Sequence, residues 1–586
     1  MTLCRALFPL LLLGAVTALL ARPAAEAARS VPPFRLPDPR DGKVVDLADW
    51  KGSKAVAVVF LGTECPVNND FLPELARLHA AYSDKGVKFV GVNSNRQDTP
   101  AKVAEHARRH AVPFPVVKDA GNKVADLFGA KRTPEAFLLD GSGKVLYRGR
   151  IDDQFGIAYR RPGKPTRRDL ACAIDEVLDC KPVSKPTTEV AGCFIGRVKE
   201  TRDDGKVTFA RHVSRVLQNN CQECHRAGQI GPMALLSYDD AVAWGETIRE
   251  VIDEGRMPPW YADPRHGEWA NDRRLSKEDR EVLLAWLDGG MPKGDDKDAP
   301  APRKFSEGWV IGTPDQVFTM PKAFDVPAET PKGGVPYKYF SVETNFAEDR
   351  WVTHAEARPG APEVVHHIIL FIVPKGEMFR PDGPSQVLCG QAPGDMPLML
   401  QPGQAKKVPA GGKLVFQMHY TPNGKAQSDR SSVGLIFAKG PPKHRVLTRP
   451  VMNRQFVTRM ASIPAGADNF PLEASFKVPD DVRIVSFMPH MHLRGKDFKY
   501  EAVAADGKAE TLLSIPRYNF NWQSIYRPKT PVLLTKGTTL HCLAHFDNSE
   551  KNPNNPDPTK KVFWGDQTWE EMMIGWIDFY VDKDAS

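Results

Sequence analysis

The sequence predicts a multidomain chain with a parallel α/β domain first, a helical domain next and an all-β second half. The length of 586 residues corresponds to about four domains at roughly 150 residues each. Strand-like and helix-like segments alternate before residue 182, and strand-like sequence surrounds the histidine motifs after residue 310. Proline accounts for 51 residues, above an average usage of about 5%, which suits short strands joined by stiff loops.

Composition and charge exclude several classes of protein. Apolar residues make up 41% of the chain and charged residues 26%, with a mean hydropathy of -0.38. These values exclude an intrinsically disordered chain and a polytopic membrane protein. The net charge of +7 is spread along the chain without a basic block, so nucleic acid is not expected as a partner.

The first 27 residues have the features of a secretory signal peptide. One positive charge, Arg5, precedes an apolar run from Leu7 to Leu20, and the small residues end in Ala25-Glu26-Ala27. An uncleaved membrane anchor is the alternative, but the run is shorter than the roughly 18 residues that a membrane span needs. We therefore expect an exported protein, periplasmic or extracellular, with no transmembrane segment after cleavage and with cysteines that can form disulfide bonds.

Residues 28–182 carry the pattern of a parallel α/β domain. The apolar strand 55–61 runs into Cys65, and a second buried strand at 87–92 is followed by a helical stretch at 101–110. This pattern, together with Thr133-Pro134, resembles the thioredoxin-like redoxins, which keep a cis-proline beside the active cysteine. The resemblance implies a thioredoxin-like fold.

The role of Cys65 is open at this point. A cysteine at a helix N-terminus has a lowered thiol pKa. However, Asn68 stands where a C-x-x-C pair has its second cysteine, and Gly62 stands where peroxiredoxins have a threonine. The pattern is compatible with a redox-active Cys65 and equally with a purely structural domain, and it disfavours a thiol peroxidase.

Two linkers and two disulfide pairings are expected. Residues 183–205 and 298–309 have the composition of linkers between domains. Connectivity cannot be read from one sequence, so the pairings are candidates only. They are Cys180 with Cys193 and Cys389 with Cys542.

Residues 206–297 contain the signature of covalent haem attachment. An amphipathic helix pattern over 209–220 leads directly into Cys221-Gln222-Glu223-Cys224-His225. In C-x-x-C-H, the two cysteines form thioether bonds to haem c and the histidine binds the iron. A zinc half-site is the alternative, but no second C-x-x-C follows, and export favours haem attachment.

The sixth ligand of this haem iron is expected downstream. Met257 is the first choice, because a methionine on a proline-stiffened loop is the usual arrangement in cytochromes c. Met233 and His266 are the alternatives. A helix pattern over 276–288 resembles the C-terminal helix of class I cytochromes c. We therefore expect an all-α cytochrome c domain with one haem.

Histidines gather in three motifs in the strand-rich second half of the chain. The motifs are His366-His367, Gln417-Met418-His419 and His490-Met491-His492. Residues i and i+2 of a strand face the same side, so His490 and His492 can bind one metal ion. His366 and His367 would point to opposite sides, and both can bind one ion only if the backbone bends or the rings use different nitrogens.

The order of these motifs, followed by a late methionine, resembles the copper type II ascorbate-dependent monooxygenases. This is the family of peptidylglycine alpha-hydroxylating monooxygenase and dopamine beta-monooxygenase. The resemblance implies two jelly-roll β-sandwiches, at residues 310–455 and 456–586, that face each other across a solvent-filled cleft with one copper ion each. The implied ligand sets are His366, His367 and His419 for the first copper, and His490, His492 and Met572 for the second, where dioxygen binds.

Residues around these ligands extend the resemblance. Met572 follows two glutamates, as the family's methionine follows an acidic pair, and Met573 is the runner-up. A thioether ligand favours Cu(I), the state that meets oxygen. Gln417 matches a family residue near the route between the two coppers.

Two departures from this family bear on the substrate. Peptide-hydroxylating members carry an arginine two residues before H-x-H and a tyrosine four residues after the methionine, where this chain has Met488 and Trp576. The clamp for a peptide carboxylate is therefore absent. We expect an apolar or aromatic-lined pocket and an unknown small-molecule substrate.

Together these patterns predict an exported copper- and haem-dependent monooxygenase that hydroxylates a C–H bond with dioxygen. Haem c is expected to replace ascorbate and to pass single electrons to the first copper, and the donor to the haem is unknown. The alternatives are a non-catalytic redox relay or copper-handling protein, and a thiol-based redoxin.

Overall fold

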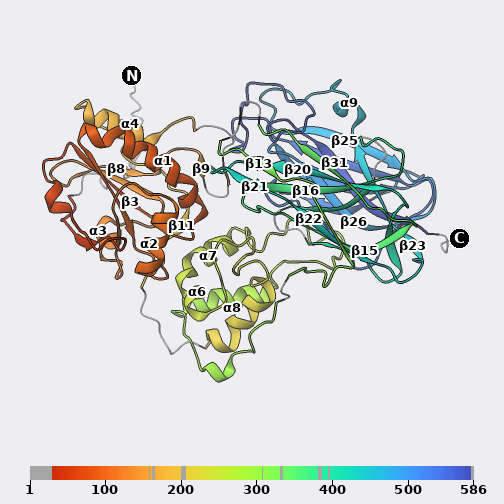
Figure 1. Cartoon of the computed structure of the whole chain (residues 1–586), viewed down its shortest axis with the longest axis horizontal. Helices are drawn as coiled ribbons and strands as arrows, with labels where there is room; N and C mark the ends of the chain where they lie inside the picture. Colours follow the sequence, from red (N-terminus) through yellow and green to blue (C-terminus); the bar gives the residue numbers. More distant parts are fainter. Residues whose placement is uncertain are drawn as a thin grey trace, which may run out of the picture.

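The chain forms an α/β body, a small helical body and a large β body (Figure 1). The structure is a computed structural model that describes residues 30–156, 159–160, 165–198, 206–305, 308–329, 331, 334–380, 386–392 and 396–582. The signal peptide expected in residues 1–27 lies outside this described part. Among the described helices, none has the length and the apolar run that crossing a bilayer demands.

The α/β body is built on a five-stranded sheet with the order β5-β4-β3-β7-β8. Strands β3 (Ala55–Phe60), β4 (Val87–Asn93) and β5 (Val116–Lys118) are parallel to one another. Strand β7 (Glu135–Leu139) pairs antiparallel with β3, and β8 (Val145–Gly149) pairs antiparallel with β7. Its helices are η2 (Leu47–Trp50), α1 (Pro66–Tyr82), η3 (Ser83–Lys85), α2 (Pro100–Arg109), α3 (Lys123–Phe128) and α4 (Asp169–Leu178). Its short strand pairs are β1 (Arg35–Pro37) with β2 (Val44–Asp46), β6 (Arg132–Thr133) with β11 (Cys193–Phe194), and β9 (Phe155–Gly156) with β10 (Tyr159–Arg160).

The side chains of β3 divide between two cores, because successive residues of a strand point to opposite faces. On one face, Ala55, Ala57 and Val59 pack with α1, α2 and α4. On the other face, Val56, Val58 and Phe60 pack with α3. All six are at most 4% exposed, as expected for a strand covered on both faces. The buried strand predicted at 55–61 is confirmed.

The α/β body extends further along the chain than predicted. Residues 183–198 pack against it, where the sequence predicted a linker over 183–205. Thr188 accepts a hydrogen bond from the backbone N–H of Arg150 at 2.9 Å, and Ile195 is buried in one of the two cores. Strand β11 pairs with β6, and the Thr133–Pro134 peptide bond is cis, as predicted.

The helical body surrounds a core of its own. It contains η4 (Phe209–Val213), α5 (Ser214–Asn220), α6 (Tyr238–Ala243), α7 (Gly245–Asp253), α8 (Lys277–Asp288) and η5 (Asp296–Asp298). Leu217 and Trp286, from the two helix patterns of the sequence, are both buried in this core. Ser276 caps α8 by accepting a hydrogen bond from the N–H of Asp279 at 2.9 Å.

An arm of the helical body, residues 256–275, docks on the β body. Trp260 and Trp269 are buried in the core of the second β-sandwich. Their rings lie 4.8 and 5.7 Å from the ring of Tyr526. The backbone N–H of Asp263 donates to the carbonyl of Ser514 at 2.8 Å. This burial attaches the helical body firmly to the second sandwich.

The first β-sandwich has two facing sheets. One contains β12 (Gln316–Thr319), β22 (Ser432–Phe437), β15 (Arg350–Arg358), β19 (Gln404–Val408), β23 (His444–Arg445) and β18 (Leu398–Met399). The other contains β14 (Lys338–Glu343), β20 (Lys413–Tyr420), β16 (Val365–Val373) and β17 (Gln386–Gln391). A separate antiparallel pair is formed by β13 (Phe324–Val326) and β21 (Gln427–Asp429). Side chains of both sheets interdigitate in one core.

The second β-sandwich begins earlier than predicted. One sheet has the order β24 (Leu447–Met452), β31 (Met573–Val581), β26 (Val482–Met491) and β29 (Val532–Leu534). The facing sheet has β25 (Phe470–Lys477), β30 (Thr539–Phe546), β27 (Gly495–Val503) and β28 (Ala509–Ile515), and α9 (Arg454–Val457) connects the two. Because β24 pairs with β31, the boundary lies before residue 447 and not at 455/456.

The two sandwiches pack directly against each other through a buried polar network. The Lys406 Nζ donates to Asp578 Oδ1 at 3.0 Å, to Thr448 Oγ1 at 2.8 Å and to the carbonyls of Val387 and Leu388 at 3.1 Å each. The Lys406 side chain is 5% exposed. The resemblance implied a solvent-filled cleft here; the structure has a buried contact in part of this interface, with cavities beside it.

Candidate metal centre

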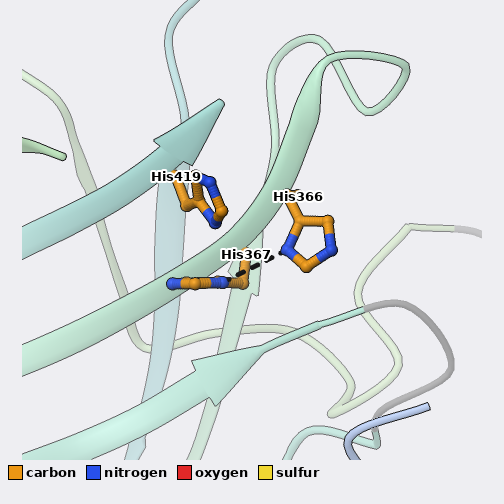
Figure 2. A group of neighbouring side chains, drawn as sticks. All are labelled: His366, His367 and His419. Atoms are coloured by element: carbon orange, nitrogen blue, oxygen red, sulfur yellow. Dashed lines mark hydrogen bonds between the residues drawn. The ribbon is translucent and has the colours of Figure 1, made fainter. Parts of the chain in front are cut away.

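Three histidines from two paired strands of the first sandwich lie side by side (Figure 2). His366 and His367 are on β16, and His419 is on β20 directly opposite His367. One ligand nitrogen from each ring lies within 4.8 Å of the others. The predicted grouping of His366, His367 and His419 is present in the structure.

A β-bulge allows neighbouring histidines to face the same point. The register of β16 against β20 shifts between Val365 and His367, so His366 is the extra residue. A bulge bends the strand and redirects the side chain of the extra residue. The Nδ1 atoms of His366 and His367 are consequently 3.3 Å apart. The sequence left two ways for both rings to bind one ion, a bend of the backbone or the use of different ring nitrogens, and the structure has the bend.

Burial keeps these three imidazoles neutral. It lowers the pKa of His366 to about 4 and that of His419 to about 3, and it lowers the pKa of His367 well below its usual value. Among the described residues, no hydrogen-bond partner reaches the buried His367 Nε2 or His419 Nδ1. Buried polar atoms normally have a partner. Neutral rings with unpartnered nitrogens fit a bound metal ion.

The second pair of histidines lies at the end of β26. The ring centroids of His490 and His492 are 5.2 Å apart. His490 Nδ1 is 2.8 Å from Gln523 Oε1, and His492 Nδ1 is 3.2 Å from the carbonyl oxygen of Glu570. With Nδ1 of each ring donating to an oxygen, Nε2 is left as the ligand atom. Burial lowers the pKa of His490 to about 4 and that of His492 further.

Met572 and its runner-up Met573 have different surroundings. Met572 lines the same cavity as His490, while Met573 is fully buried in the core of the second sandwich. Glu571, which precedes Met572, accepts hydrogen bonds from the backbone N–H groups of His492 at 2.8 Å and Arg494 at 2.7 Å. Burial raises the pKa of Glu571 to about 7. This carboxyl group ties the H-x-H segment to the methionine segment.

Both histidine groups border one cavity of about 160 Å³. Its lining residues come from both sandwiches and include Tyr337, His367, Gln417, Met488, His490, Gln523, Met572 and Trp576. Gln417 donates a hydrogen bond to the hydroxyl of Tyr339 at 3.0 Å. A second cavity of about 130 Å³ shares Met488 and Trp576 with the first. The predicted apolar, aromatic lining is present at the two positions singled out in the sequence.

Three contacts of the centre carried no signal in the sequence. The ring of Tyr337 lies 5.5 Å from His367 and 4.9 Å from His419. The ring of Phe520 stacks on His366 at 5.2 Å and meets His492 edge-on at 5.8 Å. Together with Gln523, these residues come from loops that are distant in sequence from the motifs. Only the fold places them between and beside the two histidine groups.

The C-x-x-C-H segment follows α5 directly. Burial raises the pKa of Cys221 to about 12 and also raises that of Cys224, so both are thiols and not thiolates. His225 Nδ1 is 3.3 Å from the carbonyl oxygen of Met233. This contact leaves His225 Nε2 as a ligand atom. Met257 is half-buried in the docked arm, two residues after Gly255.

Cys65 is the N-cap residue of α1, as predicted for a cysteine at a helix N-terminus. Its thiol donates a hydrogen bond to the carbonyl of Thr133 at 3.0 Å. The eight cysteines in the described residues are all unbridged, so neither candidate disulfide is formed. Cys389 and Cys542 are buried in the separate cores of the two sandwiches. Their separate locations explain why that predicted pairing is absent.

Comparisons with known proteins assign two regions of the chain. The family model described as Redoxin matches residues 26–157, and the one described as Copper type II ascorbate-dependent monooxygenase, C-terminal domain, matches residues 457–586. The thiol-disulfide oxidoreductase ResA of Bacillus thuringiensis subsp. konkukian (strain 97-27) is 31% identical over 121 residues, which cover 21% of this chain and 68% of ResA. ResA of Bacillus subtilis (strain 168) is 36% identical over 118 residues, or 20% of this chain and 62% of that protein.

Two solved structures match part of the chain. An uncharacterized conserved protein from Geobacillus kaustophilus has 32% sequence identity and a TM-score of 0.28. The match covers 30% of this chain and 94% of that one. A hypothetical protein from Sinorhizobium meliloti 1021 has 31% identity and a TM-score of 0.27, with 29% and 94% covered.

Proposed function

The chain belongs to the redoxin family through its N-terminal domain and carries a copper type II monooxygenase C-terminal domain, and from this premise we propose that it is an exported copper- and haem-dependent monooxygenase. In this proposal it acts in the periplasm or outside the cell. It hydroxylates a C–H bond of a small apolar molecule with dioxygen.

The observation that carries the proposal is the convergence of two ligand groups on one cavity. His367 of the first group and His490 of the second both line it. The ring of Phe520 also contacts both groups, because it lies 5.2 Å from the His366 ring and 5.8 Å from the His492 ring. The two groups are therefore close enough to serve one reaction site.

The donor sets fit copper. Three neutral imidazoles suit copper in both oxidation states, and a thioether beside two imidazoles suits its reduced state. Bound copper supplies one-electron redox chemistry and the activation of dioxygen. The protein's part is to orient the rings: Gln523 and the carbonyl of Glu570 hold His490 and His492 through Nδ1, and outer partners of this kind set ligand geometry.

The lining of the cavity supports an apolar substrate. Met488, Trp564, Ile574 and Trp576 contribute apolar surface, and such surface favours molecules with little charge. Gln417 offers an amide close to the first histidine group. A substrate that fills this space would present a C–H bond to the His490 side while it excludes water.

We propose haem c as the immediate electron donor to the first copper. Cys221 and Cys224 would form the thioether bonds, His225 would bind the iron, and Met257 is proposed as the sixth ligand, with Met233 and His266 as alternatives. The free thiols and the Met233 carbonyl on His225 Nδ1 support this assignment.

Contacts between the helical body and the histidine groups support electron transfer. Asn519 donates a hydrogen bond to the hydroxyl of Tyr261 in the docked arm at 3.3 Å. The next residue, Phe520, stacks on His366 and also contacts His492. A short chain of contacts thus leads from the arm that carries Met257 to both histidine groups.

Copper content and oxygen insertion test the monooxygenase proposal. Wild-type protein should hold two copper ions per chain and add one oxygen atom to a member of a library of small apolar compounds, read by mass. His490→Ala should lose one ion and all product. The control His541→Ala changes a histidine of β30, in the sheet that faces the one carrying His490 and His492. His541 bonds to Glu501 and Glu473, and this variant should keep both coppers and the product.

Other outcomes are equally decisive. Two coppers without substrate-dependent oxygen uptake would favour a redox relay or copper-handling protein. Wild-type copper well below two ions per chain would reject the copper centre. For the haem, the reduced protein should show sharp c-type absorption bands that Cys224→Ala weakens, and stopped-flow oxidation of haem by oxygen should require copper.

A further inference from the structure

Two cysteines from distant parts of the chain converge on Thr133. The thiol of Cys65 donates to the Thr133 carbonyl at 3.0 Å. Cys193, in β11, lies directly opposite Thr133 in the β11–β6 register. The side chain and the backbone N–H of Cys193 are both hydrogen-bond partners of the Cys65 sulfur. The two sulfur atoms are therefore neighbours.

The backbone before Cys193 is shaped for this approach. Gly192 has a φ of 131°, and a Cβ atom there would lie 2.0 Å from the Thr133 carbonyl oxygen. Only glycine avoids that clash. The close approach of β11 to β6 thus depends on the residue immediately before Cys193.

The usual position for a second cysteine is occupied by an amide. Asn68, three residues after Cys65, is fully buried and donates from Nδ2 to the carbonyl of Gly62 at 2.7 Å. It therefore stabilises the loop before the helix and cannot form a disulfide. Any cysteine partner of Cys65 must come from another segment.

We propose that Cys65 and Cys193 form a redox-active dithiol/disulfide pair, with strand β11 supplying the second cysteine that the C-x-x-C position lacks. The co-reactant is a low-molecular-weight thiol or its disulfide. Cys65 is 1% exposed, and Cys193 packs against the core of the helical body. Burial shields Cys65 from a folded protein partner, whereas Cys193 is partly exposed, so the proposal assigns a small thiol that attacks at Cys193.

The reaction exchanges two electrons and is balanced. An external thiolate attacks the Cys193 sulfur of the disulfide, the Cys65–Cys193 bond breaks, and Cys65 leaves as a thiolate that then takes up a proton. A second external thiolate attacks the external sulfur of the mixed disulfide, and Cys193 leaves and is protonated. Two external thiols become one disulfide, and the pair is reduced to two thiols. The reverse sequence oxidises the pair.

The environment of Cys65 suits the leaving role. Burial opposes the thiolate, but hydrogen bonds from Cys193 and from the N–H of Asn68 outweigh it and lower the pKa of Cys65 to about 7. The hydrogen bond to Cys65 and burial raise the pKa of Cys193. A thiol of lower pKa leaves faster in disulfide exchange. Attack on Cys193 with departure of Cys65 is therefore the favoured direction.

The test equilibrates the native full-length protein with mixtures of reduced and oxidised dithiothreitol, followed by alkylation, digestion and mass spectrometry. A peptide linked through Cys65 and Cys193 should predominate in oxidising mixtures and disappear in reducing ones, reversibly and without unfolding. Cys193→Ala should abolish it, and the matched control Cys180→Ser should leave it unchanged.

Three results would contradict the proposed redox pair. They are no Cys65–Cys193 linkage in wild-type protein at any ratio of reduced to oxidised dithiothreitol, a linkage that resists reduction until the protein unfolds, or a Cys180–Cys193 linkage in its place. The measurement needs neither copper nor haem, so its outcome is independent of the monooxygenase proposal.

Discussion

Replacing Asp578 by alanine should destabilise the contact that holds the two sandwiches together. Among the described residues, Asp578 is the only carboxylate that bonds to Lys406 Nζ, at 3.0 Å, and the lysine side chain is 5% exposed. Its other partners, Thr448 and two carbonyls, carry no charge to balance the ammonium group. Removing one partner of a buried ion pair costs about 3–5 kcal/mol, because the other charge stays buried and uncompensated.

This cost converts into a thermal shift. For a folded unit of about 250 residues, 1 kcal/mol lowers the transition temperature by roughly 2–4 °C, so Asp578→Ala should lower the transition of the sandwich pair by at least about 6 °C. Differential scanning calorimetry of the full chain resolves it from the transitions of the other bodies. Lys406→Met/Asp578→Ala should recover much of the loss, because no unpaired charge remains.

A neighbouring ion pair gives the matched control. Lys407, next in sequence, pairs with Asp349 at the surface, where the two side chains are 29% and 40% exposed. Asp349→Ala should leave the transition nearly unchanged, because exposed pairs contribute little. If Asp578→Ala shifted the transition no more than Asp349→Ala, the buried network would not hold the sandwiches together.

Three further predictions concern the metal centre. Gln523→Ala should weaken copper binding at the second site by about 10–100-fold, measured by chelator competition, whereas Gln455→Ala on the exposed face of α9 should not. Met572→Leu should weaken Cu(I) binding by removing the soft ligand, whereas Met573→Leu, in the core, should leave it unchanged. Copper-free protein should lose stability as the pH falls from about 6.5 to about 4, measured as a lower denaturant midpoint. The pKa of His366 is lowered to about 4 in the folded protein, so this imidazole stays neutral over that range. The same histidine in the unfolded chain takes up a proton, which favours unfolding.

Each of these has a contrary outcome. Equal copper affinity in Gln523→Ala and wild type would mean that the amide does not orient His490. A Met573→Leu effect on Cu(I) as large as that of Met572→Leu would exchange their roles. A flat stability profile from pH 7 to pH 4 would show that the buried imidazoles are not held neutral.

Local patterns in the sequence were sufficient for the order of the bodies and for most ligand candidates. The apolar run 55–61 is a strand and the segment after Cys65 is a helix, because strand and helix periodicity are local properties. The three histidine motifs likewise contain the histidines of the candidate metal centre. Boundaries were less accurate: β24 joins the second sandwich and residues 183–198 join the α/β body, and both depend on pairing with distant strands.

The sequence by itself determined which chemical groups this protein carries, because residue types and their spacing are written in it: paired histidines, a late methionine, a C-x-x-C-H and a cysteine before a helix. Only the tertiary structure decided which of these groups meet. Strand register and loop packing across long separations in sequence produce four of these contacts. They are the bulge at His366, the cavity shared by His367 and His490, the ring of Phe520 between the two histidine groups, and the approach of Cys193 to Cys65. Such contacts depend on the packing of the whole chain, which no local pattern encodes.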